Sequence, residues 1–130
     1  MIIEIIGNRA SGKSIMAYEI MSNINLEPII VDVNKQYNRK RLEYITRMKE
    51  NGIVTGNNLF RGVGVGNILQ EEDFHFGTNE IYLFEIDDYP KDSTEHKLMK
   101  KAILAAVEAD ANIIYTKFSS HERVRVRVLV

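Results

Sequence analysis

The amino-acid sequence predicts an α/β fold with three layers, in which helices cover both faces of a mostly parallel, five-stranded sheet. Apolar runs without alternation, such as Ile29–Val33, are typical of strands buried on both faces. Segments with helical spacing separate these runs, as parallel strands with right-handed crossovers require. The 130 residues contain no linker-like stretch, so we expect a single domain over residues 1–130.

The first half of the chain begins with a predicted strand over Met1–Ile6. After a glycine-rich loop, Lys13–Ile24 is a predicted helix, since apolar residues recur there every four positions. Pro28 precedes the second strand, Ile29–Val33. A helix is predicted over Arg41–Asn51, where an apolar stripe ends at an Asn-Gly stop signal.

The middle of the chain has a weaker pattern. Ile53–Thr55 and Leu59–Arg61 flank a Gly-Asn-Asn turn, which predicts a small hairpin. Gly62–Gly66 alternates glycine and valine, and we expect it to be a flexible strip.

The second half predicts a third buried strand over Glu80–Asp87 and a helix over Asp92–Ala109, capped by Asp92 with Glu95. Asn112–Phe118 is predicted as the fourth strand and Arg123–Val130, with its regular alternation, as the fifth.

Composition limits the function. The formal net charge is −1, so a nucleic-acid surface would have to be local. The absence of cysteine excludes disulfides and cysteine-based zinc sites. No run approaches the roughly 20 apolar residues of a membrane span, and the short apolar start does not resemble a signal peptide. We therefore expect a cytoplasmic protein without a membrane-spanning helix.

The stretch GNRASGKS fits the phosphate-loop (Walker A) pattern G-x-x-x-x-G-K-[ST] at every fixed position. Its glycines permit a tight turn whose backbone N–H groups face an anion, and the following helix adds its positive end. Lys13 would reach the β- and γ-phosphates of ATP, and the Ser14 hydroxyl would ligate Mg²⁺. The predicted nucleotide-binding residues are Gly7, Asn8, Arg9, Ala10, Ser11, Gly12, Lys13 and Ser14.

An acidic group follows the third predicted strand. Asp87 is the expected magnesium-side acid, and Asp88 is the candidate for polarising water. Glu85 is an alternative for magnesium, because residues two apart in a strand point the same way. Asp88, Tyr89 and Pro90 can also be read as ordinary turn chemistry.

Four segments in this order, GNRASGKS, IIVDVNKQY, IYLFEIDD and NIIYT, resemble the HerA/FtsK superfamily of P-loop ATPases, especially viral DNA-packaging and Zot-like phage assembly proteins. Asp32 and Tyr37 match the ends of the Asp-Pro-x-x-Glu-Tyr-like signature of that superfamily, whereas Val33 and Gln36 depart from it. The resemblance implies a RecA/FtsK-like P-loop NTPase domain of minimal size that forms a homo-oligomeric ring.

The resemblance also implies further site residues. Thr116 occupies the end of the fourth strand, where an additional-strand NTPase places a γ-phosphate sensor and where this family usually has Gln. Arg123 is the best candidate for an arginine finger, followed by Arg125, although outward arginines are also typical of an exposed edge strand. Asp88 stands where the family has Glu, so we expect slow hydrolysis.

Five residues after the second strand form a candidate DNA surface, in which basic side chains meet phosphates and a tyrosine stacks on a base. A solvated helix start is the alternative interpretation. The five residues are Lys35, Tyr37, Arg39, Lys40 and Arg41.

The sequence thus predicts a magnesium-dependent ATPase that drives nucleic-acid translocation, packaging or assembly for a virus or mobile element. Two alternatives stay open. A small-molecule or nucleotide kinase is disfavoured because few residues follow Phe118 to form a lid. The other alternative is a nucleotide-binding assembly module without turnover.

Overall fold

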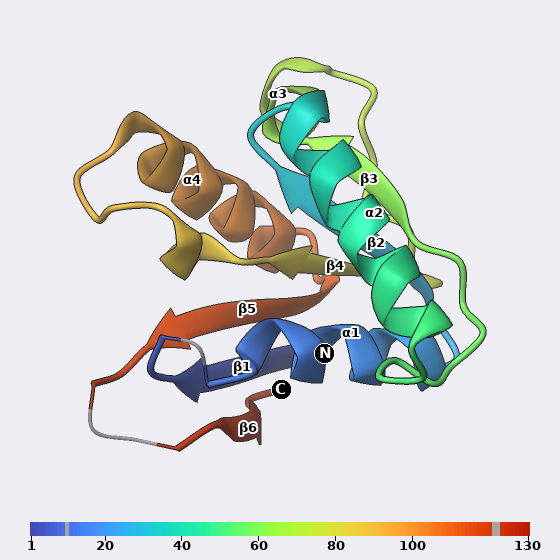
Figure 1. Cartoon of the computed structure of the whole chain (residues 1–130). Coiled ribbons are helices and arrows are strands. Elements are labelled where there is room, and N and C mark those ends of the chain that lie inside the picture. The colour runs from blue at the N-terminus through green and yellow to red at the C-terminus, as the bar shows by residue number, and fades with distance from the viewer. Residues whose placement is uncertain (10, 121–122) are drawn as a thin grey trace.

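The computed structural model describes residues 1–9, 11–120 and 123–130. It is an α/β structure built on one six-stranded sheet in the order β3-β2-β4-β5-β1-β6 (Figure 1). All neighbouring strands are parallel except β6, which runs antiparallel to β1. The strands are β1 (Ile2–Gly7), β2 (Glu27–Asp32), β3 (Arg61–Gly64), β4 (Glu80–Phe84), β5 (Asn112–Phe118) and β6 (Arg125–Val128). The helices are α1 (Lys13–Asn23), α2 (Lys35–Glu50), α3 (Val65–Gln70) and α4 (Thr94–Glu108), with a 3₁₀ turn, η1, at Ile86–Asp88.

The α/β class and the mostly parallel sheet are confirmed, but the expected number of five strands is wrong. The additional strand is β3, formed by part of the glycine-valine strip that we expected to be flexible. It pairs with β2 so that Val63 lies opposite Val31. A larger residue is disfavoured at position 62 for a steric reason: a Cβ there would lie 2.8 Å from Cγ of Asn38 on α2.

The predicted hairpin over Ile53–Arg61 is also wrong, because residues 53–60 form no strand. This segment instead packs against the end of α1. The Asn58 side-chain amide donates to the carbonyl oxygens of Met21 at 2.9 Å and Ile24 at 2.6 Å. These hydrogen bonds satisfy carbonyl groups that the helix end leaves free, so the segment acts as a C-terminal cap.

Two helices begin at other residues than predicted. Helix α2 begins at Lys35 rather than Arg41, because the Asn34 side chain accepts a hydrogen bond from the Tyr37 N–H at 3.0 Å. Helix α4 is capped by Ser93, whose hydroxyl accepts from the His96 N–H at 3.1 Å, and not by Asp92. Both caps are residue types that favour helix N-termini.

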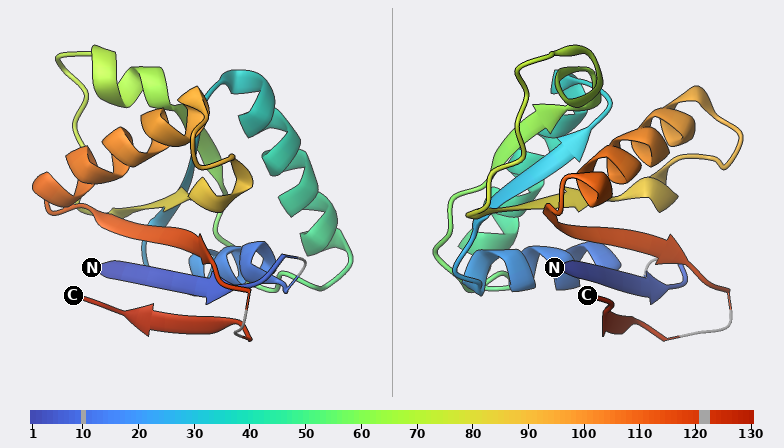
Figure 2. Two further views of the ribbon diagram at one scale, coloured as in Figure 1. Left: turned by 90° about the vertical axis from the view of Figure 1, so that its left-hand side faces the viewer. Right: turned by 180° about the vertical axis from the view of Figure 1, so that it is seen from behind.

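The core has two parts, one on each face of the sheet. Tyr18 and Met21 of α1 and Ile45 of α2 pack on one face, against side chains that include Ile30 and Leu83. Side chains of α3 and α4 pack on the opposite face. Figure 2 shows the helices on both sides of the sheet. No helix in the described ranges is long and apolar enough to cross a membrane.

The antiparallel strand β6 brings the two chain ends together (Figure 1). The Ile2 N–H donates to the Val130 carbonyl oxygen at 3.1 Å, and the Leu129 N–H donates to the Ile2 carbonyl oxygen at 2.8 Å. The alternating pattern correctly predicted this strand. At the other end of the parallel strands, their carboxyl ends meet at one edge of the sheet, where ligands bind in open α/β folds.

Candidate functional site

The predicted loop lies between the end of β1, at Gly7, and the start of α1, at Lys13. This confirms the predicted order of strand, loop and helix. Gly12 has φ of +91°, a conformation that glycine adopts without strain. At Gly7 a Cβ would lie 2.6 Å from Ser11 Oγ, so a side chain there would require the Ser11 hydroxyl to move. Ala10, one of the predicted nucleotide-binding residues, lies outside the described residues.

The Lys13 ammonium group lies against its own loop. Its Nζ donates to the carbonyl oxygens of Gly7 at 2.7 Å and Asn8 at 2.9 Å. It also forms an ion pair with Asp87 Oδ2 at 3.0 Å, and both side chains are nearly buried. These three acceptors take up the three N–H donors of the ammonium group, so an anion that entered the loop would have to displace at least one of them.

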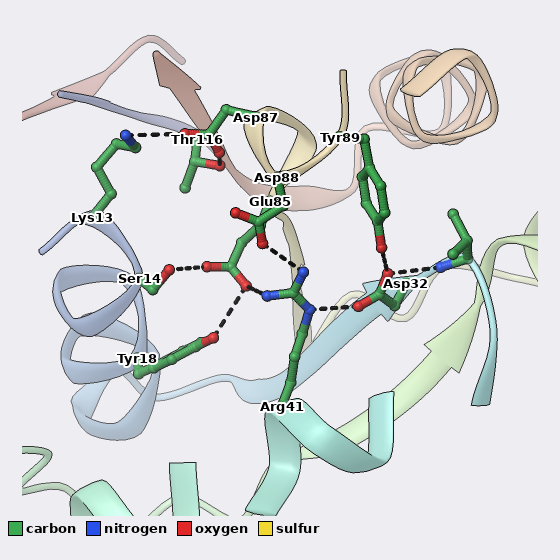
Figure 3. A network of polar contacts seen from close by, with 11 residues as sticks. Lys13, Ser14, Tyr18, Asp32, Arg41, Glu85, Asp87, Asp88, Tyr89 and Thr116 are labelled. Atoms are coloured by element: carbon green, nitrogen blue, oxygen red, sulfur yellow. Dashed lines mark hydrogen bonds and ion pairs between the residues drawn. The ribbon is translucent and has the colours of Figure 1, made fainter. Parts of the chain in front are cut away.

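Glu85 is the central acid of the site. It follows the last residue of β4, and only 3% of its surface is exposed. Oε1 accepts a hydrogen bond from the Ser14 hydroxyl, and Oε2 accepts one from the Tyr18 hydroxyl at 3.1 Å (Figure 3). Burial raises the pKa of Glu85, whereas the nearby Arg41 charge opposes this rise. Burial and the Glu85 charge together raise the pKa of Tyr18, which keeps its proton to donate.

Asp87 lies apart from Glu85, on the other side of the site. The third strand was predicted to continue to Asp87, but β4 ends at Phe84 and a 3₁₀ turn follows. The two acids therefore have different partners. Asp87 pairs with Lys13 and accepts a hydrogen bond from the hydroxyl of Thr116, a buried residue near the end of β5.

Arg41 of α2 joins three carboxylates that come from separate parts of the chain. Its guanidinium group contacts Asp32 at the end of β2, Glu85 after β4 and Asp88 in η1 (Figure 3). The distance from NH2 to Asp88 Oδ2 is 2.6 Å. Burial lowers the pKa of Arg41, but the charges of Glu85 and Asp32 outweigh it and the net pKa is raised.

Asp32 is fully buried, and both of its carboxylate oxygens accept hydrogen bonds. Besides Arg41 it accepts hydrogen bonds from the Tyr89 hydroxyl and, at 2.9 Å, from the Val33 N–H. Burial and the Asp32 carboxylate raise the pKa of Tyr89. Sequence reasoning missed the roles of Arg41, Tyr18 and Tyr89 here, although an acid in an apolar run, Glu85, signals a buried partner.

The remaining predicted residues are more peripheral. Arg123 and Arg125 are exposed, and Arg123 follows residues 121–122, which are outside the described ranges. Val124 Cγ2 would lie 3.2 Å from a Cβ at Gly7, so this segment passes beside the loop. In the candidate DNA surface Lys35, Tyr37, Arg39 and Lys40 are exposed, whereas Arg41 points inward to the acids.

Among the described residues, the site has more acid than base, because four carboxylates form ion pairs with two cations, Lys13 and Arg41. The four acids are Asp32, Glu85, Asp87 and Asp88. This excess of negative charge favours an added cation. Within the described ranges, no group of three or more His, Asp or Glu side chains is placed to hold a metal ion alone. A metal here would therefore need ligands from a bound partner molecule or from water.

Comparison with known proteins gives no match, either to a family model or to a curated protein.

Proposed function

We propose that this chain binds ATP with Mg²⁺ and hydrolyses it, as an additional-strand P-loop NTPase similar to the HerA/FtsK superfamily. The observation that carries the proposal is a pairing of groups across the sheet edge. The first two residues of α1, Lys13 and Ser14, each contact an acid that follows β4, Asp87 and Glu85 respectively. A triphosphate with magnesium needs this combination of ammonium, hydroxyl and carboxylate groups.

The strand order supports the additional-strand class. In that class one strand separates the strand before the phosphate loop from the strand that ends in the acids. Here β5 lies between β1 and β4. Its Thr116 donates a hydrogen bond to Asp87, which supports the proposed role of Thr116 as a sensor of the γ-phosphate. The kinase alternative would need an additional segment of chain to form a binding site for the molecule that accepts the phosphate.

The roles of the residues follow from their contacts. Lys13 and the loop N–H groups would bind the phosphates. Ser14 would hold magnesium, and Glu85 fits the magnesium side better than Asp87 because the Ser14 hydroxyl donates to it. Asp87, which contacts Lys13 and Thr116, then remains to orient water together with Asp88. When bound, magnesium neutralises charge on the phosphate oxygens.

The proposed work on nucleic acid rests on α2. This helix carries the exposed Lys35, Arg39 and Lys40 and also Arg41, which contacts the magnesium-side acid. A movement of α2 on DNA would therefore change the surroundings of Glu85, and a change at Glu85 would move the basic surface. In a ring, Arg123 would serve as the finger for the neighbouring subunit.

A second candidate function is nucleotide-dependent assembly without turnover. The ion pair that favours it is Arg41–Asp88, because the guanidinium group lies 2.6 Å from Asp88 Oδ2 and occupies a carboxylate oxygen that would otherwise accept from the attacking water. Binding and turnover must therefore be measured separately.

The test is calorimetry with ATP and Mg²⁺, followed by phosphate release with and without DNA. Lys13→Ala should abolish binding, whereas Lys100→Ala, on exposed α4 surface, should not. DNA-stimulated release supports the motor, release of ADP dependent on a small acceptor supports a kinase, and binding without release supports the assembly module. If the unchanged chain binds no nucleotide, the proposal is wrong.

A further inference from the structure

A second candidate site lies away from the phosphate loop, at the open edge of the sheet. A groove of about 720 Å³ is lined by one side of α2, by Gly62 and Gly64 of β3, and by Asn67 of α3. Helices α2 and α3 cover opposite faces of the sheet. A groove lined by both helices therefore runs along the sheet edge itself rather than across one face.

The floor of the groove is a strand with free hydrogen-bonding capacity. In the described part of the sheet β3 pairs only with β2, so the outer side of its backbone has no strand partner. Such an edge offers both N–H donors and C=O acceptors. Gly62 and Gly64 have no side chains that could cover these groups. One of the groups is already paired, because the Gly64 N–H donates to Asn67 Oδ1 at 3.2 Å, so a peptide would have to compete with Asn67 there.

Asn38 adds an unpartnered polar group. Only 5% of this residue is exposed, and it lines the groove where it packs against Gly62. Its Oδ1 is a buried side-chain oxygen that has no hydrogen-bond partner among the described residues. A buried carbonyl without a donor is unfavourable, and a rotation of the carboxamide would present it to a donor in the groove.

The charged residues that line the groove indicate what kind of ligand it can bind. Lys35, Arg39 and Arg47 line the groove together with a single acid, Glu43. The walls therefore attract an acidic partner. A nucleic acid fits less well for two reasons. No aromatic ring is found among the described lining residues to stack on a base, and phosphate oxygens only accept hydrogen bonds, so they leave the strand's C=O groups unpaired.

We infer that this groove binds an extended acidic peptide segment of another protein, which adds to the sheet as a strand beside β3. A peptide strand supplies N–H and C=O groups in alternation, so it satisfies both kinds of group on the β3 edge. Its N–H groups can also reach the Asn38 carboxamide, while its acidic side chains meet the basic residues of α2. The inference does not depend on nucleotide binding, but it competes with the proposed DNA surface, because Lys35 and Arg39 belong to both.

The test uses a fluorescein-labelled eight-residue peptide in which glutamate and valine alternate. We expect saturable fluorescence anisotropy that weakens with added salt. Two peptides should fail: one with lysine in place of glutamate, and one with proline at alternate positions, which removes N–H groups. In NMR spectra the peptide should shift the backbone amides of Gly62 and Gly64 and the side-chain amide of Asn38.

Four variants locate the binding. Arg47→Glu reverses a wall charge outside the candidate DNA surface and should weaken binding about three- to tenfold. Asn38→Ala should also weaken it. Lys100→Glu makes the same kind of charge change on distant α4 and should not, and Lys13→Ala should leave peptide binding intact.

The inference is overturned if no saturable binding occurs up to a peptide concentration of about 1 mM. It is equally overturned if Arg47→Glu and Asn38→Ala bind as well as Lys100→Glu, or if the Gly62 and Gly64 amides do not shift. Displacement of the peptide by a single-stranded oligonucleotide that itself shifts these amides would assign the groove to nucleic acid instead.

Discussion

Arg41 is the residue on which the polar site depends most. One guanidinium group balances two buried carboxylates, Asp32 and Glu85, and a third, Asp88, at its rim. Breaking a buried ion pair by removing one partner is costly, because the other charge stays behind in a poorly solvated place. Arg41 therefore serves the stability of the fold as well as the proposed position of Glu85.

Arg41→Met should lower the free energy of unfolding by about 3–5 kcal/mol, because Asp32 and Glu85 lose their common counter-charge. Urea unfolding followed by circular dichroism measures the change. Arg39→Met, on the exposed side of the same helix, should stay within about 0.5 kcal/mol of the unchanged chain. Equal effects of the two variants would contradict the structural role of Arg41.

Glu19 gives a residue-scale prediction on pH. The Thr55 hydroxyl and N–H donate to its carboxylate, and the hydroxyl hydrogen bond is the main cause that lowers the pKa of Glu19. A lowered pKa in the folded chain stabilises the fold above the ordinary glutamate value, about 4.3. That contribution is lost as the pH falls through the folded value.

Thr55→Val should therefore raise the pKa of Glu19 toward its ordinary value and make unfolding less dependent on pH in this acidic window. NMR titration of the Glu19 side chain and urea unfolding at several pH values test the two parts. An unchanged Glu19 pKa in Thr55→Val would show that the hydrogen bond is not its cause.

At the scale of elements, sequence patterns were strongest where local chemistry decides the structure. The glycine-rich loop, the long helix before Asn112 and the alternating last strand could be predicted because their signals are short-range. The β3 strand could not, since the need for glycine at position 62 comes from Asn38, which is distant in sequence and fills the space that a side chain would take. Arg41 was placed on a DNA surface for the same reason: nothing local shows that Asp32 and Glu85 lie beneath it.

The start of α2 shows how a cap can outweigh an unfavourable first turn. Lys35 begins the helix, although a cation near an N-terminus opposes the helix dipole. Asn34→Ala removes the side-chain acceptor for the Tyr37 N–H and should lower the free energy of unfolding by about 1 kcal/mol. Thermal unfolding measures it. Asn34→Asp, which keeps an acceptor, should preserve stability, and a loss as large as in Asn34→Ala would contradict the capping role.

At the scale of the whole molecule, the two proposed sites lie at different borders of one sheet. The phosphate-loop site lies at the carboxyl ends of β1, β2, β4 and β5, where the acids, Lys13 and Thr116 meet. The proposed peptide groove lies along the outermost strand, β3. Helix α2 borders both sites, through Arg41 on one side and Asn38 on the other. A ligand at either site would therefore stabilise the same helix.

Nucleotide binding should stabilise the entire chain, because a ligand that binds only the folded state shifts the unfolding equilibrium. At about 100 times its dissociation constant, ATP with Mg²⁺ should add about 2.7 kcal/mol to the free energy of unfolding. The rise in melting temperature should be absent in Lys13→Ala and retained in Lys100→Ala. It should shrink when magnesium is chelated, because Ser14 and Glu85 are the residues that we propose to hold the ion. An equal rise in Lys13→Ala would place the nucleotide elsewhere, and no rise in the unchanged chain would contradict the phosphate-loop interpretation.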